Sequence, residues 1–173
     1  DLIQAAKLGF SDAAIMNTKD LVFKPEYRKF CEENSAGTIT ESACPPESGT
    51  VEEMMAQALK YEKRWFFRLF RLLKLVQESE TFHNQLTEQL AEQMKATGMT
   101  DLLIMSAGPY KHHSCMSAYC VDAQEMADAV GMIAGAMMEK SAIFSQIFVS
   151  RKTVAWSNWE SHFPGNEYLL ELT

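Results

Sequence analysis

The alternation of apolar and polar residues predicts a chain in which strands and helices follow one another. The aromatic-rich run KRWFFRLFRLLKLV, which begins at Lys63, favours a strand over residues 64–70. In that strand Trp65 and Phe67 face one side, while Phe66 and the arginines face the other. A basic amphipathic helix that lies on a membrane surface is the alternative for the same run.

The clearest helix is predicted over residues 79–96. Its apolar residues repeat every four positions from Phe82 to Met94, and Gly98 ends the pattern. Because His83 lies beside this apolar stripe, it is interpreted as a packed or surface histidine rather than a metal ligand.

The remaining apolar segments complete the predicted fold. Strands are expected at 10–16, 101–106, 143–153 and, as an edge strand, 168–172. Shorter helices are expected at 2–8, 25–31, 50–61 and 122–130. Strands interleaved with helices predict one domain over residues 1–173 of the α/β or α+β class, with helices packed on a mixed sheet.

The helix expected at 50–61 has a marked start. Thr50 and Glu53 have the spacing of a capping box, in which each side chain binds the other residue's backbone N–H group. Pro45 and Pro46 stiffen the preceding backbone and favour an extended Cys44. A cysteine ahead of a helix N-terminus is favoured as a thiolate, and a buried structural cysteine is the alternative.

The composition and net charge of the chain exclude some classes of function. With 47% apolar residues the chain has enough material for a core, and its net charge of −7 argues against general nucleic-acid binding. The sequence has no apolar run long enough to span a membrane and opens without a secretory signal, so a cytoplasmic protein with reduced cysteines is expected. The 11 methionines and two C-terminal tryptophans fit a core or a homo-oligomer surface equally well.

Two loops hold the four cysteines and half of the histidines. The second loop, GPYKHHSCMSAYC, follows a predicted buried strand, which is a common place for a functional site. Thiolate and imidazole are zinc ligands, and four thiolates hold an iron–sulfur cluster. If the loops converge, they form a metal site from Cys31, Cys44, Cys115 and Cys120, with His112 or His113 as substitutes.

Two other interpretations use the same residues. In the first, the histidine pair is solvent-exposed and the cysteines pack beneath it without metal. In the second, Cys44 is a nucleophile with His112 or His113 as its base, as in a cysteine-dependent enzyme. The sequence contains no P-loop, dinucleotide-binding, zinc-protease or serine-hydrolase motif that would favour another chemistry.

The run YRKFCEEN…AGTITESACPPESGTVEEM resembles a family of bacterial and archaeal predicted metal-binding proteins. The family pattern is Arg-x-x-Cys-x-x-Asn-x-Cys-Gly, a linker, then Cys-Pro-Pro-x-x-Gly-Thr-x-Glu-Glu. The matching positions are Arg28, Cys31, Asn34, Gly37, Cys44, Pro45, Pro46, Gly49, Thr50, Glu52 and Glu53. GPYKHHSCMSAYCVDAQEMADAVGM is similar to the family's second loop, so the resemblance implies binding of an iron–sulfur cluster or zinc.

Four positions depart from the cysteines of that family: Ala36, Ser48, Tyr110 and His113. Histidine can replace cysteine as a ligand, whereas alanine cannot. The resemblance therefore implies either a reduced ligand set or a metal-free interaction or small-ligand module on the same scaffold. The expected partner is an unidentified protein or small molecule, with no nucleic acid and no membrane.

Overall fold

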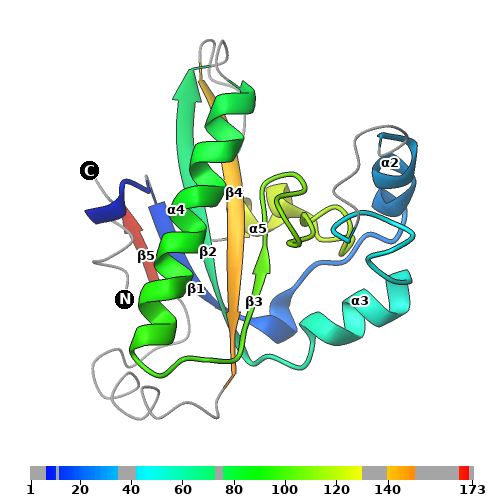
Figure 1. Cartoon of the computed structure of the whole chain (residues 1–173), viewed down its shortest axis with the longest axis horizontal. Coiled ribbons are helices and arrows are strands. Elements are labelled where there is room, and N and C mark those ends of the chain that lie inside the picture. Colours follow the sequence, from blue (N-terminus) through cyan, green and yellow to red (C-terminus); the bar gives the residue numbers. More distant parts are fainter. Residues whose placement is uncertain are drawn as a thin grey trace.

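The computed structural model describes residues 7–10, 12–34, 42–72, 76–129, 140–150 and 168–171 (Figure 1). Its elements in chain order are β1 (Asp12–Asn17), η1 (Thr18–Asp20), α2 (Tyr27–Asn34), α3 (Val51–Ala58), β2 (Lys63–Leu72), α4 (Val76–Ala96), β3 (Leu102–Met105), α5 (Ala123–Ala129), β4 (Lys140–Val149) and β5 (Tyr168–Glu171). Most of the helix expected at 2–8 lies outside the described residues.

The strands form one sheet in the order β3-β4-β2-β1-β5. Each pair of neighbouring strands is antiparallel, and β5 forms one edge, as expected for residues 168–172. Of the two fold classes expected from the sequence, α+β is confirmed, because helices pack on an antiparallel sheet. A single domain over the whole chain stays a prediction.

Strand β2 lies at the centre of the sheet and is buried on both faces. Trp65 and Phe67 join the apolar cluster under α4, whereas Phe66 joins the cluster on the opposite face. This alternation is the one predicted from the sequence, so the alternative of a basic membrane-surface helix is wrong for this segment. Arg64 is fully buried, and its Nη1 donates to Gln146 Oε1 at 2.8 Å and to Met126 Sδ at 2.9 Å.

Among the described residues, no helix has the length and apolar character needed to cross a membrane.

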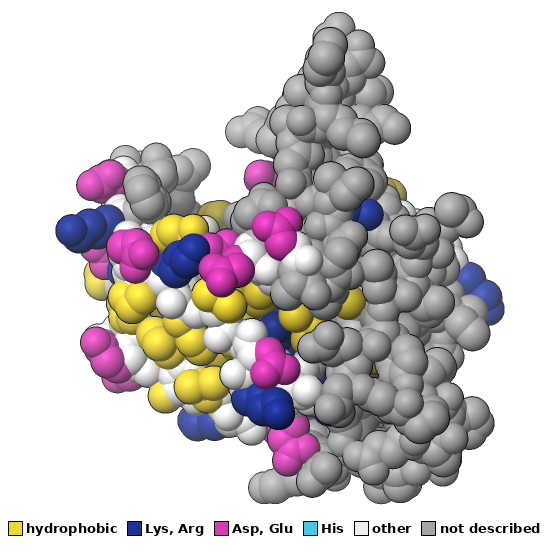
Figure 2. Space-filling model, turned by 180° about the vertical axis from the view of Figure 1, so that it is seen from behind, with side chains coloured by type: hydrophobic (Ala, Val, Ile, Leu, Met, Phe, Trp, Pro, Cys, Tyr) yellow, Lys and Arg dark blue, Asp and Glu magenta, His cyan; other side chains and the backbone are white. Residues whose placement is uncertain are grey.

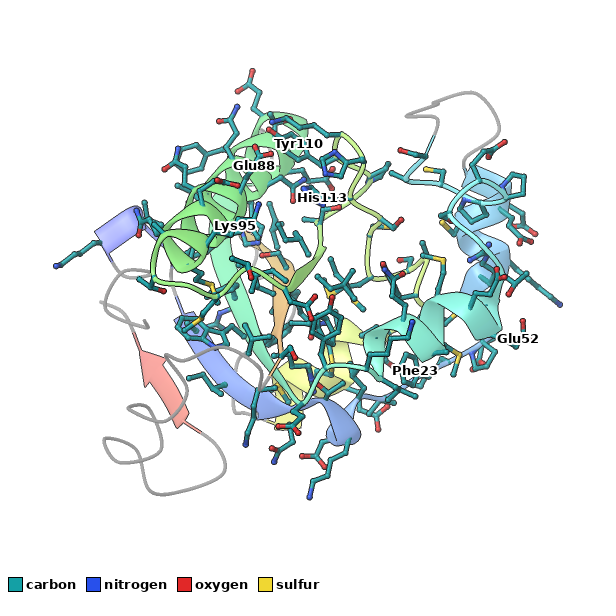
Figure 3. The ribbon with its side chains drawn as sticks, turned by 60° about the horizontal axis from the view of Figure 1, so that its bottom comes forward. Phe23, Glu52, Glu88, Lys95, Tyr110 and His113 are labelled. Atoms are coloured by element: carbon teal, nitrogen blue, oxygen red, sulfur yellow. The ribbon has the colours of Figure 1, made fainter. Side chains whose placement is uncertain are left out.

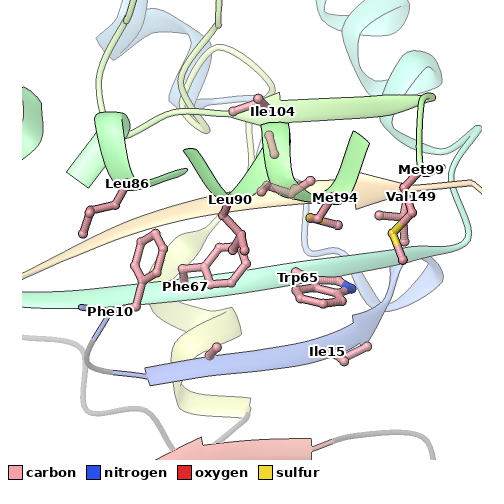
Figure 4. Packing of buried hydrophobic residues seen from close by; sticks show 13 residues of the cluster. Phe10, Ile15, Trp65, Phe67, Leu86, Leu90, Met94, Met99, Ile104 and Val149 are labelled. Atoms are coloured by element: carbon pink, nitrogen blue, oxygen red, sulfur yellow. The ribbon is translucent and has the colours of Figure 1, made fainter. Parts of the chain in front are cut away.

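Helix α4 covers one face of the sheet (Figure 4). Leu86, Leu90 and Met94 are buried against Trp65 and Phe67, as the apolar stripe predicts. The expectation that Phe82 belongs to the same stripe is wrong, because its side chain is 41% exposed. Residues spaced four apart rotate by about 40° around a helix at each step, so the first side chain of the series has turned away from the buried face.

His83, rather than Phe82, is the buried side chain near the start of α4. Its Nε2 lies 2.8 Å from Ser145 Oγ on β4, and its ring meets Phe10 edge-on, with ring centroids 5.2 Å apart. The interpretation of His83 as a packed histidine is confirmed.

On the opposite face of the sheet, one apolar cluster joins sheet residues to residues of α3, of the loop that follows β3 and of α5. Met54, Met105, Met116 and Met126 belong to the apolar cluster there, and Cys31 and Cys115 pack against it. In Figure 1, α4 crosses the sheet in front, while α5 lies behind it and α2 and α3 stand to one side. Figure 2, seen from behind, shows an apolar surface area bordered by acidic and basic side chains. The cysteine-bearing segments are thus on the face away from α4.

The predicted capping box starts α3. Thr50 Oγ1 accepts from the Glu53 N–H at 3.2 Å, and Glu53 Oε2 accepts from the Thr50 N–H at 2.9 Å. The helix ends at Ala58, earlier than expected, and two turns finish the segment before β2. Helix α2 begins at Tyr27 rather than at Pro25, because residues 25 and 26 form a turn.

Replacing Thr50 with alanine is expected to lower the free energy of unfolding by about 1 kcal/mol, because one N–H group at the start of α3 loses its partner. Urea denaturation of the two proteins measures this difference. Thr50→Ser is the matched control, since serine keeps the hydroxyl oxygen, and it should remain close to the wild type. Equal losses in both variants would contradict the capping role.

Candidate metal centre

Arg28 on α2 joins the three segments that carry the cysteines. Its side chain is buried, and Nη1 donates to the Ala118 carbonyl at 3.0 Å in the loop after β3. The same Nη1 contacts Met54 Sδ at 3.2 Å, and Nη2 donates to the Gly49 carbonyl at 2.5 Å, just ahead of α3. One guanidinium group therefore holds α2, the turn before α3 and the second cysteine loop together.

Cys31 lies one turn after Arg28 along α2, at the spacing that places two side chains on the same helix face. Cys31 and Cys115 pack against the same apolar cluster, and the interaction with Cys115 is the largest cause that raises the pKa of Cys31. The charge of Cys44 raises it further. The structure thus brings together Cys31 and Cys115, with Cys44 nearby. The convergence of the two loops expected from the sequence is therefore present at these residues.

The pKa values of Cys31 and Cys115 shift in opposite directions. The hydrogen bond from Cys31, followed by backbone N–H groups of Ala118, Ser117 and Cys115 itself, lowers the pKa of Cys115 to about 6 against the opposing effect of burial. The hydrogen bond to Cys115, and then burial, raise the pKa of Cys31. The backbone N–H groups of the second loop thus favour negative charge on Cys115 rather than on Cys31.

Cys44 is buried in the turn that leads to α3. Its carbonyl accepts from the Ser48 N–H at 3.0 Å, and the Gly49 N–H donates to the Pro46 carbonyl at 3.1 Å. Gly49 has a φ of +109°, which a side chain would strain, so glycine is required where this turn meets the helix cap. These contacts hold Cys44 at a defined position just before α3.

Cys120 has its hydrogen bonds with the start of α2 rather than with the thiol pair. Its Sγ donates to the Pro25 carbonyl at 3.9 Å, and its carbonyl accepts from the Lys24 N–H at 2.7 Å. Burial raises the pKa of the Cys120 thiol, opposed by the charge and backbone N–H of Arg28. With a φ of +58°, Cys120 closes the second loop against residues 24–28.

His112 and His113 lie toward α4, at the other end of the second loop. Their ring centroids are 4.2 Å apart, and neighbouring Lys111 binds Glu88 on α4 at 2.7 Å. Figure 3 shows His113 beside Glu88 and Lys95. His112 is exposed and His113 is half-buried; burial, and then the charge of His112, lower the pKa of His113.

Two residues that shape this region had no role in the predicted site. Arg28 was part of the recognised motif, but nothing in its spacing indicated that it would be buried between loops. Asn84 on α4 pairs with Ala107 in both directions, its Nδ2 donating to the carbonyl at 2.8 Å and its Oδ1 accepting the N–H at 2.9 Å. An asparagine beside an apolar helix stripe was the only available signal.

The sulfur donors of Cys31 and Cys115 suit a thiophilic ion, but in the described part of the chain no third donor lies close enough to them to complete a metal site. Within the described ranges, no three His, Cys, Asp or Glu side chains are grouped closely enough to hold a metal ion. Cys31 and Cys115 supply neighbouring sulfur donors, and the charge of Cys44 also raises the pKa of Cys31. The ligand set of four cysteines and two histidines stays a prediction.

Comparison with known proteins places the chain in a family. No curated protein and no solved structure matches it. The family described as predicted metal-binding protein (DUF2284) matches residues 14–112, more than half of the chain. The matched range contains Arg28, Cys31 and Cys44 and ends just before Cys115. The chain therefore belongs to this family of predicted metal-binding proteins.

Proposed function

We propose that the protein binds a zinc ion through the thiolates of Cys31, Cys44 and Cys115. The observation that carries this proposal is that Cys31 and Cys115, which come from two separate segments, pack against the same apolar cluster and each shift the pKa of the other. Neighbouring sulfur donors, with the pKa of Cys115 lowered, are the starting arrangement for binding a thiophilic ion.

Zinc suits this donor set better than an iron–sulfur cluster. A cluster is usually held by four cysteine thiolates, and the hydrogen bonds of Cys120 are with the backbone around α2. Zinc also accepts three protein ligands and keeps one position open. Bound there, zinc would supply a cross-link between the segments and a Lewis-acid centre.

Binding requires two changes in this chain. The turn that holds Cys44 moves closer to the thiol pair, because the described side chains do not yet group as three ligands. Cys31, whose pKa is raised, loses its proton on binding, so zinc binding releases a proton. Arg28 favours the loss of this proton, because its charge lowers the pKa of Cys31.

Zinc titration of the reduced, metal-free protein tests this function, with a coloured chelator as competitor. One zinc per chain is expected, and Cys115→Ser should weaken binding by at least about a hundredfold, because even partners outside the ligand shell contribute up to about that factor. Cys120→Ser is the matched control and should bind zinc like the wild type. Wild-type affinity in Cys115→Ser would overturn the proposal.

The same titration separates zinc from the other interpretations. A wild type that binds iron in a cluster, with the loss in Cys120→Ser as large as in Cys115→Ser, would support the four-cysteine site. A folded wild type that takes up neither metal would support the metal-free interaction or small-ligand module.

A further inference from the structure

Helix α3 stands to one side of the sheet and has an apolar edge on its outer surface (Figure 1). Its Met54 and Ala58 are buried in the core, whereas Met55 is half-buried and Leu59, at the end of the helix, is 53% exposed. Among the large apolar side chains that the structure describes, Leu59 and Phe82 are the exposed ones. Leu59 therefore extends the apolar edge of α3 into solvent.

Beside this edge lie two opposite charges that cannot pair with each other. Glu52, Ala56 and Lys60 are exposed and follow at intervals of four residues, so they share one side of the helix. The Lys60 N–H donates to the Gln57 carbonyl at 3.3 Å, which continues the helical turn past the end of α3. Figure 3 shows Glu52 at the end of α3 that lies away from the sheet. Eight residues span about 12 Å along a helix, which is too far for an ion pair within one chain.

Neither charge is used elsewhere in the described part of the chain. The ion pairs there involve other residues, and neither Glu52 nor Lys60 has a further interaction with the rest of the chain. The outer side of α3 thus presents an acidic group, a small residue and a basic group in a row, next to exposed apolar surface.

We propose that α3 forms a homodimer interface, in which two copies of this helix pack antiparallel about a twofold axis at Ala56. This arrangement places Glu52 of each chain opposite Lys60 of the other, so two ion pairs form at once. The small side chain of Ala56 lets the two helices approach closely. The twofold axis also brings Met55 and Leu59 of both chains to the same side of the contact, where they cover one another.

A second copy of this chain fits the pattern because the pattern is complementary to itself. Glu52 and Lys60 lie four residues before and four residues after Ala56, so a single axis satisfies both charges. The contact uses one short helix from each chain and is smaller than the roughly 1,200 Å² that stable interfaces bury, so the dimer is expected to dissociate on dilution. None of these side chains is a candidate metal ligand, and the proposal does not depend on zinc binding.

Analytical ultracentrifugation of the full chain tests the proposal, with a reductant and a chelator present to exclude disulfide-linked and metal-linked dimers. The wild type should show a reversible monomer–dimer equilibrium. Leu59→Asp should weaken the dimer by at least about tenfold, because a charge enters the apolar contact. Phe82→Asp is the matched control: it changes the other exposed apolar side chain, on α4, and should dimerise like the wild type.

Charge reversal tests the antiparallel pairing itself. Glu52→Lys and Lys60→Glu should each weaken the dimer by about tenfold, because each places like charges opposite one another at two symmetric positions. The double variant Glu52→Lys/Lys60→Glu should recover the wild-type affinity. An equimolar mixture of the two single variants should form a heterodimer, since one chain then presents two positive groups and the other two negative groups.

Three results would overturn the proposal. The first is a wild type that stays monomeric at every concentration tested. The second is equal weakening by Leu59→Asp and Phe82→Asp, which would indicate an effect of added charge at any surface. The third is a mixture of the single variants that associates no better than either variant alone. Circular dichroism of each variant confirms that it is folded before it is compared.

Discussion

Arg28→Ala is expected to lower the free energy of unfolding by about 2 to 4 kcal/mol, because it leaves the carbonyls of Ala118 and Gly49 without their donor. The truncation also removes a buried side chain that packs on Met54 Sδ. Since the guanidinium group joins the segments that carry Cys31 and Cys115, zinc affinity should fall together with stability. Urea denaturation and zinc titration measure the two effects.

Lys29→Ala is the matched control for Arg28→Ala. Lys29 is the next residue on α2 and is exposed, so its removal should leave both stability and zinc affinity nearly unchanged. If Arg28→Ala unfolds at the same urea concentration as the wild type and binds zinc as tightly, Arg28 does not hold the loops together.

Phe67→Ala is expected to have the largest effect on stability, lowering the free energy of unfolding by about 3 to 5 kcal/mol through loss of buried area and a cavity. Phe67 is fully buried on the central strand β2, and its ring stacks on Phe10 with centroids 4.8 Å apart. The neighbouring strands and α4 leave little freedom for this site to collapse. Thermal or urea denaturation measures the loss.

The control is the same substitution at an exposed phenylalanine. Phe82 lies on α4 with 41% of its side chain exposed, so Phe82→Ala should lower the free energy of unfolding by less than about 1 kcal/mol. Similar losses in the two variants would contradict the assignment of Phe67 to the core. Zinc affinity should survive Phe67→Ala in the folded fraction, because Phe67 faces away from the cysteine segments.

Local patterns predicted much of the fold. The faces of β2 were predictable because Trp65 and Phe66 point to opposite sides of any strand. The start of α3 was predictable because Thr50 and Glu53 satisfy each other's backbone groups without help from distant residues. The helix stripe was predicted less well, since equal spacing of four residues hid the rotation that exposes Phe82.

The order of the strands and the pairing of the cysteines depend on contacts between distant segments. The spacing of Cys115 and Cys120 does not reveal that one meets Cys31 while the other binds the backbone at Pro25. That difference depends on how α2 packs against the second loop, which only the assembled fold determines. The acidity of Cys115 likewise depends on a hydrogen bond from another element, so it could not be assigned from sequence.

X-ray absorption of the zinc-loaded wild type at the zinc edge tests the central claim most directly. Sulfur neighbours at about 2.3 Å are predicted, with fewer of them in Cys115→Ser and an unchanged number in Cys120→Ser. A shell that contains only nitrogen or oxygen at about 2.0 to 2.1 Å would contradict a thiolate site built from Cys31, Cys44 and Cys115.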